Sequence, residues 1–259
     1  MHDNKGNALV DQRAAREKEA FDTTGVLESS MRLQQRFYHV KESRNTLYGE
    51  SFFEDTLTTI CKDATILGYG CFDGRLAPKY KNLGAKRIIG IDISERGIGM
   101  ANTKWGDVAE FQVCDAHNVR MLGDSSVDAI VGKAILHHLN FEQAIREIHR
   151  LLRPGGTALF LEPLYDNPAS KLFRFLTPHA RTKDEKPLSR GQIQWADTQF
   201  SSHAHRFCNL ITTPVGLVTS LLPLSPSNPL LNVADLCDRR LERTRMRYWM
   251  RIVFLSWEK

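Results

Sequence analysis

The chain of 259 residues is 42% hydrophobic and 25% charged, a composition typical of globular domains. This length is enough for a full hydrophobic core and fits one domain with appended segments. The formal net charge of +5 permits an anionic partner but does not require one. The five cysteines are odd in number and scattered without a CxxC pair, which argues against a disulfide framework or a zinc site.

The N-terminal segment is polar and charged. Residues 1–20 lack the apolar core of a signal peptide, so we expect a cytoplasmic protein. From residue 21 to 63, apolar side chains recur at three- and four-residue steps, which predicts two or three helices. We expect residues 1–60 to form a helical cap segment over the ligand end of residues 61–259.

A glycine-rich turn follows the first predicted strand. The sequence ATILGYGCFDG, residues 64–74, begins with the apolar pair Ile66 and Leu67 and leads into a helix-like segment, Arg75–Lys81. Glycines at such a turn permit positive φ and close approach of a ligand, and the amides of a helix N-terminus attract negative or polar groups. The turn therefore predicts a nucleotide or nucleoside pocket, although this spacing also occurs in plain tight turns.

The second predicted strand ends in an acidic residue. Residues 85–94, AKRIIGIDIS, form a near-continuous apolar run typical of a parallel strand covered on both faces. Asp92 follows the glycine turn by about twenty residues, where an acid at a strand end can hold ribose hydroxyls. Ser94 is then a candidate N-cap for a helix that reaches Trp105.

Strands and helices continue to alternate up to residue 163. Further strands are predicted at Val108–Val113, Val127–Gly132 and Thr157–Leu161, and a helix at Phe141–Leu152. This rhythm predicts a parallel, doubly wound α/β sheet. Ligands of such sheets bind at the carboxyl ends of the strands. The glycine turn, Asp92, Asp115, the segment after Val131 and Glu162 would all gather at that edge.

The rhythm breaks after residue 163. We predict a helix at Ala169–Leu176, a long loop up to about residue 200, and a strand at His203–Ile211. A helix at Ala234–Arg243 and a strand at Tyr248–Trp257 complete the chain. We expect residues 164–245 to form a cap or lid insertion.

Two surface features have alternative interpretations. Residues 207–234 contain no charged residue, but Pro223, Pro226 and Pro229 make them a poor membrane-spanning helix. They are either a buried strand and helix with a proline-rich loop, or a peripheral membrane contact. The arginines of residues 239–247 lack aromatic platforms for a nucleic acid, so a solvated helix face is favoured and no nucleic-acid partner is expected.

With these motifs in view, residues 64–163 resemble the class I S-adenosylmethionine-dependent methyltransferases, especially their small-molecule group. The resemblance lies in six motifs in the family's order: ILGYGCFDG, GIDIS, Cys114-Asp115-Ala116, DSSVDAIV, AILHHL and LLRPGG. It implies a Rossmann-like doubly wound sheet of about seven strands, mostly parallel with an antiparallel last strand, plus the helical cap. It also implies S-adenosyl-L-methionine as cofactor and S-adenosyl-L-homocysteine as product.

The resemblance implies roles for individual residues. Asp92 would bind the ribose and Asp115 the adenine amino group. The full set of expected cofactor-binding residues is Tyr38, Arg44, Gly68, Tyr69, Gly70, Asp92, Ile93, Asp115, Ala116 and Lys133. The chain departs from the family at Gly68, where an acid usually holds the methionine end of the cofactor, and at Phe72, where a glycine is usual. Tyr38 and Arg44 are candidates to replace the missing contact.

The acceptor side is less defined. His137 and His138 are candidate catalytic bases, because histidine titrates near neutral pH. The candidate substrate-binding residues are His138, Glu162, His179, Arg181 and His203. No metal site is expected, since the histidine spacing fits no metal-ligand pattern.

We therefore predict methyl transfer to a small-molecule acceptor, with a hydroxyl oxygen of a natural product, sugar or lipid precursor as the leading candidate. The rival interpretations are a nicotinamide-dependent oxidoreductase, whose dinucleotide turn fits the same glycines, and a non-catalytic scaffold with a decayed pocket. In the oxidoreductase fold AILHHL and LLRPGG have no role. The sequence does not indicate an oligomeric state.

Overall fold

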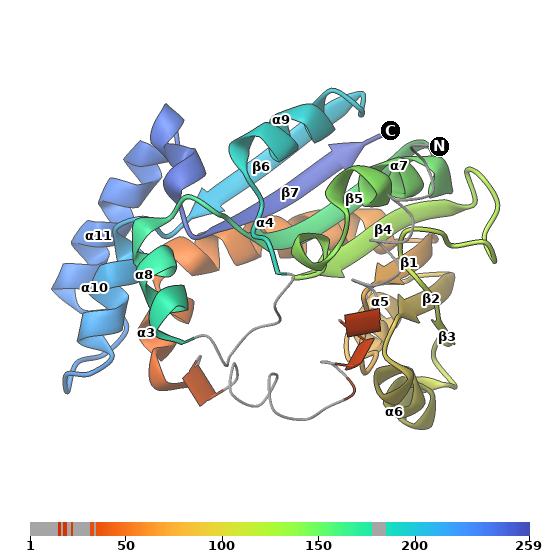
Figure 1. Cartoon of the computed structure of the whole chain (residues 1–259), viewed down its shortest axis with the longest axis horizontal. Coiled ribbons are helices and arrows are strands. Elements are labelled where there is room, and N and C mark those ends of the chain that lie inside the picture. The colour runs from red at the N-terminus through yellow and green to blue at the C-terminus, as the bar shows by residue number, and fades with distance from the viewer. Residues whose placement is uncertain (1–14, 17, 20–21, 23–31, 34, 178–184) are drawn as a thin grey trace.

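The computed structural model describes residues 15–16, 18–19, 22, 32–33, 35–177 and 185–259. A seven-stranded sheet crosses the molecule in the order β3-β2-β1-β4-β5-β7-β6 (Figure 1). The strands are β1 (Thr65–Tyr69), β2 (Arg87–Asp92), β3 (Glu110–Val113), β4 (Val127–Lys133), β5 (Leu152–Pro163), β6 (Ser202–Cys208) and β7 (Ile252–Glu258). Strands β1 to β5 pair in parallel, and β7 runs antiparallel to β5 and β6. The predicted Rossmann-like sheet and its antiparallel last strand are confirmed.

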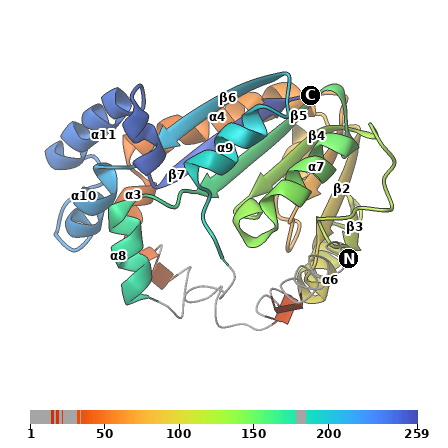
Figure 2. The same ribbon diagram turned by 45° about the horizontal axis from the view of Figure 1, so that its top comes forward.

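Helices cover both faces of the sheet (Figure 2). On one face, α4 (Arg44–Cys61), α5 (Ala77–Asn82) and α6 (Glu95–Trp105) pack on side chains such as Ile66 and Ile88. On the other, α7 (Phe141–Leu151) and α9 (Arg190–Asp197) pack on Leu67 and Ile130. Both faces of the central strands are therefore buried, which explains their near-continuous apolar sequences.

Four helices gather at the β6 end of the sheet, far from β3 (Figure 1). This terminal helical group consists of α3 (Tyr38–Lys41), α8 (Pro168–Leu176), α10 (Thr212–Thr219) and α11 (Pro229–Leu241), and α10 packs against the other three. Buried carboxylates join its parts. Asp235 accepts a hydrogen bond from the Arg44 N–H at 3.1 Å, and Asp238 accepts from the N–H of Thr212 at 3.0 Å.

The structure corrects several predicted boundaries after residue 163. Helix α9 lies inside the predicted loop and begins with a capping box, in which Ser189 and Gln192 satisfy each other's backbone N–H. Helix α11 begins at Pro229, not Ala234, because proline fits the first turn of a helix. The last strand is preceded by a 3₁₀ turn, η3 (Arg245–Trp249), instead of starting at Tyr248.

A glycine allows the long helix α4 to approach the sheet. A Cβ at Gly49 would lie 2.1 Å from the Phe254 ring and 2.8 Å from Cys208 Sγ. We expect Gly49→Ala to destabilise the fold by about 1–3 kcal/mol through overpacking. The exposed Gly99 of α6 has open space around its Cβ position, so Gly99→Ala should stabilise by about 0.5–1 kcal/mol. Urea unfolding of both variants measures the difference, and equal effects would contradict the packing described.

Candidate functional site

The glycine turn after β1 has the positive-φ backbone that its sequence predicts. Gly70 and Gly74 have φ of 70° and 68°. A Cβ on Gly70 would lie 2.6 Å from the Ile135 side chain, so this turn and the turn after β4 are in contact. The N–H groups of Gly70 and Cys71 both donate to the Ile91 carbonyl at 2.9 Å, which fixes the turn against β2.

Phe72 occupies a left-handed position in the same turn, with φ of 44°. Such a conformation normally favours glycine. Its ring is accommodated by Gly97 of α6, where a Cβ would lie 2.7 Å from Phe72 Cδ2. The family usually has a glycine at position 72. In this chain the glycine lies on the neighbouring helix instead, where Gly97 leaves space for the Phe72 ring.

Asp92, at the end of β2, joins the turn to α6. Its Oδ2 accepts a hydrogen bond from the Phe72 N–H at 2.8 Å, and its Oδ1 accepts from the Ser94 N–H at 2.9 Å. Ser94 caps α6 as predicted, because its hydroxyl accepts from the Gly97 N–H. Burial raises the pKa of the Asp92 carboxyl, and the two N–H donors limit that rise. Each oxygen retains acceptor capacity for a ligand hydroxyl.

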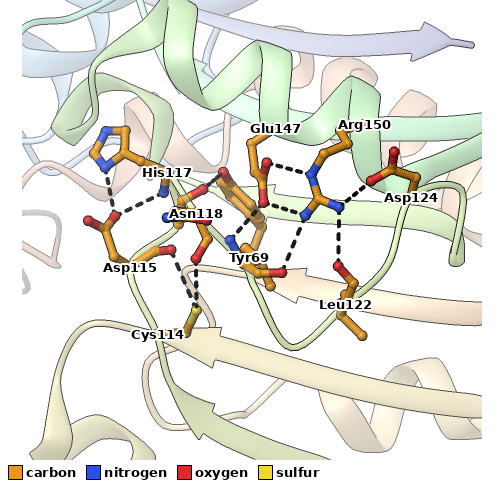
Figure 3. Close-up of polar contacts among 11 residues, drawn as sticks. Tyr69, Cys114, Asp115, His117, Asn118, Leu122, Asp124, Glu147 and Arg150 are labelled. Carbon is orange, nitrogen blue, oxygen red and sulfur yellow. Dashed lines mark hydrogen bonds and ion pairs between the residues drawn. The ribbon is translucent and has the colours of Figure 1, made fainter. Parts of the chain in front are cut away.

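Asp115 lies in the loop after β3 and is paired with His117. Its Oδ1 accepts from the His117 N–H at 2.9 Å and contacts His117 Nδ1 at 2.7 Å. Since His117 Nε2 accepts from the Asn140 N–H at 2.9 Å, Nδ1 carries the ring hydrogen. Burial opposes ionisation of Asp115, but the hydrogen bonds from His117 outweigh it and lower the pKa of this carboxyl. In Figure 3 the other Asp115 oxygen has no contact with the residues drawn.

Two buried groups hold the loop that contains Asp115. The Tyr69 hydroxyl donates to the Ala116 carbonyl, which links the glycine turn to the loop. Further along, Glu147 accepts from the Val119 N–H at 2.7 Å, and Arg150 donates to Glu147, Asp124 and the Leu122 carbonyl (Figure 3). The loop is therefore fixed from β1 on one side and from α7 on the other.

A third carboxylate, Glu162, organises the turn after β4. It is fully buried at the end of β5, and its Oε1 accepts from the N–H groups of Ile135 and Leu136 at 2.9 and 2.8 Å. Its Oε2 contacts Nδ1 of His137, in the turn η1 (Leu136–His138), at 2.7 Å. Ala134 adopts φ of 56° just before this turn, an uncommon conformation that is often found at functional sites.

The structure brings most predicted residues to the carboxyl edge of the sheet. His138 stacks against His137 with ring centroids 4.1 Å apart. Lys133 ends β4 with its ammonium 4.3 Å from the centroid of the Phe53 ring, and burial lowers its pKa. Gly68 lies in β1 two residues before Gly70, and Ile93 and Ala116 lie in the loops after β2 and β3. The predicted residues His179 and Arg181 lie outside the described residues.

The remaining predicted residues lie as follows. The Tyr69 side chain is fully buried, and its hydroxyl donates to the Ala116 carbonyl. Tyr38 begins α3 and Arg44 begins α4, where the Arg44 N–H donates to Asp235 of α11. His203 lies on the edge strand β6 beside Asp197 of α9. The ligand contacts expected of these four residues stay predictions.

Several site residues were not predicted. His117, Glu147 and Arg150 were missed, although the Glu-Ile-His-Arg sequence of α7 places Glu147 and Arg150 on one helix face. Asp22 was also missed, because the N-terminal segment was interpreted as a loose cap. Its Oδ1 accepts from the Ser94 hydroxyl at 2.6 Å, next to Asp92.

Two groups among the described residues offer three potential metal ligands each: His137, His138 and Glu185 at the site, and Asp197, His203 and His205 at the β6 edge. In the second group, His205 Nε2 and the Trp257 Nε1–H both contact Asp197 Oδ1 at 2.8 Å. This network also joins α9 to the sheet without any metal. The absence of a resident metal stays a prediction.

The sheet order, the glycine turn and the two strand-end acids define the class I S-adenosylmethionine-dependent methyltransferase fold. Residues 67–160 match the family described as methyltransferase domain. This central region is therefore homologous to the family, and the resemblance seen in the motifs is confirmed.

Curated relatives match the same part of the chain. An O-methyltransferase of Penicillium expansum is 28% identical over 109 residues, which cover 40% of this chain and 39% of the relative. A demethylmenaquinone methyltransferase of Chlorobaculum parvum is 26% identical over 111 residues, covering 42% and 46%. A tRNA (carboxymethyluridine(34)-5-O)-methyltransferase of Mus musculus is 31% identical over 139 residues, covering 50% and 20%. The matches thus span less than half the length of these relatives.

Solved structures share the fold at low identity. Geranyl diphosphate C-methyltransferase from Streptomyces coelicolor A3(2), in complex with Mg2+, geranyl diphosphate and S-adenosyl-L-homocysteine, superposes with a TM-score of 0.56. Its identity is 15%, covering 81% of this chain and 79% of that one. A chain of the complex between the Haloferax volcanii Trm112 methyltransferase activator and a putative methyltransferase gives 0.58 at 15% identity, covering 92% and 96%.

The hydrogen bond from Tyr69 to Ala116 can be tested without any ligand. We expect Tyr69→Phe to leave a buried carbonyl unpaired and to cost about 1–3 kcal/mol. Hydrogen exchange of residues 114–122 should accelerate, because the loop loses its anchor on β1. Tyr48→Phe, at a half-exposed position on α4, serves as control and should change neither quantity. Unchanged exchange in the Tyr69 variant would remove this residue's positioning role.

Proposed function

We propose that the chain transfers a methyl group from S-adenosyl-L-methionine to a small-molecule acceptor, with a hydroxyl oxygen as the acceptor atom. The observation that carries the proposal is the meeting of three structural features at one sheet edge: the glycine turn, the strand-end acids Asp92 and Asp115, and the Glu162–His137 pair. The family match of residues 67–160 supports the same activity.

The donor and acceptor groups present fit this cofactor. Asp92 is a buried carboxylate held by backbone N–H groups, with acceptor capacity for ribose hydroxyls. Asp115 is kept ionised by His117 and can accept from an exocyclic amino group. The turn at Gly68 and Gly70 supplies backbone that a ligand can approach closely. When bound, the cofactor supplies an electrophilic methyl group on a sulfonium.

The Glu162–His137 pair provides a base. Glu162 accepts two backbone hydrogen bonds and holds the hydrogen of His137 Nδ1, so Nε2 is the basic nitrogen of this ring. With cofactor and acceptor bound, Nε2 of His137 would take the hydroxyl proton as the acceptor oxygen bonds to the methyl carbon, and it would later release that proton to solvent. The cofactor would supply the methyl group through cleavage of its carbon–sulfur bond, with the neutral thioether as the leaving group. General-base assistance of this kind typically contributes about 10²–10⁴-fold.

The histidine pair is nearly closed off from solvent, which favours methyl transfer to the acceptor over methyl transfer to water. His137 and His138 are 5% and 9% exposed. The Lys186 N–H donates to the His137 carbonyl at 2.9 Å, so the segment that follows the long loop lies against the base. We expect this segment to contact the acceptor and so to select it. Exclusion of water would strengthen the polar contacts between the segment and the acceptor.

Cofactor binding is tested by calorimetric titration with S-adenosylhomocysteine. We expect Asp92→Asn to bind roughly 10- to 100-fold more weakly than the wild type, because it loses a charged acceptor. The raised pKa of Asp92 means that its carboxylate takes up a proton at a higher pH than an ordinary aspartate. As the pH is lowered, wild-type affinity should therefore begin to fall at a higher pH than it would for an ordinary aspartate, while the affinity of Asp92→Asn should change less.

Titration with NAD and NADP, and an Asp128→Asn variant, complete this experiment. Asp128 begins β4 at the opposite edge, where it accepts from the Thr65 N–H, and its replacement should leave affinity unchanged at a temperature where both variants are folded. Binding of a dinucleotide alone would establish the oxidoreductase interpretation. Equal affinity of Asp92→Asn and wild type would contradict the ribose assignment.

The base assignment distinguishes the two adjacent histidines. With tritium-labelled S-adenosylmethionine and a panel of phenols, sugars and prenyl alcohols, we expect transfer to a hydroxyl compound. On that acceptor His137→Gln should lower kcat by about 10²-fold or more and leave S-adenosylhomocysteine affinity intact. His138→Gln, at the neighbouring ring, should cost about tenfold or less. The reverse order would assign the base to His138, and transfer only to carbon or nitrogen acceptors would contradict the oxygen assignment.

A further inference from the structure

The terminal helical group has an apolar outer surface. Helix α8 buries no side chain, and Leu172, Phe175 and Leu176 are 62%, 81% and 63% exposed. Their spacing of three and one residues places them on one side of the helix. The other side of α8 packs only partly on the chain, through α10 and through Phe173 against Phe37, so the exposed apolar side is the less favourable one in water. An apolar environment outside the chain would bury the exposed side of α8.

Helix α11 presents a second apolar face. Leu230, Val233 and Leu236 recur every three residues and are 61%, 64% and 51% exposed. Arg240 follows four residues later and extends the same face with a positive charge. The two acids of this helix are buried on its other side, where Asp235 and Asp238 bind backbone N–H groups.

Exposed apolar residues also lie at the end of α10 and in its link to α11. Val218 of α10 and Leu221 and Leu222 of the link are 59%, 60% and 47% exposed, and α10 packs against both α8 and α11. Both views of the molecule show these three helices together at one end (Figures 1 and 2). Residues 207–234 contain no charge, and Lys171 and Arg240 lie beside the exposed apolar residues on α8 and α11.

We propose that α8, the α10–α11 link and the outer face of α11 dock on an anionic lipid bilayer. Exposed Leu, Val and Phe side chains beside Lys171 and Arg240, with the two acids of α11 turned inward, follow the pattern of interfacial helices, and Lys171 also pairs with Asp166. In the described part of the chain no helix is long and apolar enough to cross a membrane, so the contact is peripheral. This inference does not depend on methyl transfer.

Cosedimentation with vesicles tests the proposal on the full chain. We expect binding to vesicles of phosphatidylcholine and phosphatidylglycerol in equal parts, weaker binding to pure phosphatidylcholine, and partial release by salt. The variant Leu172→Ser/Phe175→Ser/Leu176→Ser changes only exposed residues and should bind about tenfold or more weakly. Arg240→Glu should weaken binding to the anionic vesicles alone.

Met121→Ser serves as the matched control. Met121 is an exposed apolar residue in the loop between β3 and β4, 38% exposed, and its replacement should leave vesicle binding unchanged. Light scattering of the same samples identifies a competing occupant. A dimer that the α8 variant dissociates, without vesicle binding by the wild type, would assign the surface to a second copy and overturn the proposal. A monomer that binds neither vesicle type would overturn it as well.

Discussion

The candidate site depends on carboxylates that are held by backbone N–H groups. Asp92 connects the left-handed Phe72 of the first turn to the start of α6, and Glu162 connects the turn after β4 to the end of β5. A carboxylate bound by amides costs less to bury than an isolated one, and it fixes loop backbone without neutralising its own charge. The same bonds that close these turns therefore leave negative charge where a cofactor and a base are needed.

These anchors are coupled through packing between neighbouring turns. Ile135 follows the strained Ala134 and fills the space that a side chain on Gly70 would occupy. The Ile135 N–H is one of the two that donate to Glu162. Ile135 therefore contacts both the glycine turn and the carboxylate that binds His137. Tyr69, next in the chain to Gly70, points to the opposite side and holds the Asp115 loop. A change in one turn is thus transmitted to all three parts of the site.

The sequence predicts this central part well because its signals are local. Strand periodicity, the glycine turn, the Ser94 cap and the strand-end acids each depend on a few neighbouring residues, and parallel topology then brings them to one edge. The packing of the helices outside this central part has no such local signal. Long-range bonds such as that from the Arg44 N–H to Asp235 fix the start of α4 against α11, and no short sequence pattern predicts them. Helix α9 has a local signal in the sequence, its capping box, but the charged residues before it favour the interpretation as a loop.

The two departures from the family pattern have different physical meanings. Phe72 keeps the positive φ of a glycine position, and Gly97 supplies the missing space, so the shape of the turn is preserved by an exchange between two elements. Gly68 has no such partner. A Cβ there would meet nothing closer than 3.5 Å, so the fold does not exclude the usual acid. Its absence therefore changes the charge of the site and not its shape.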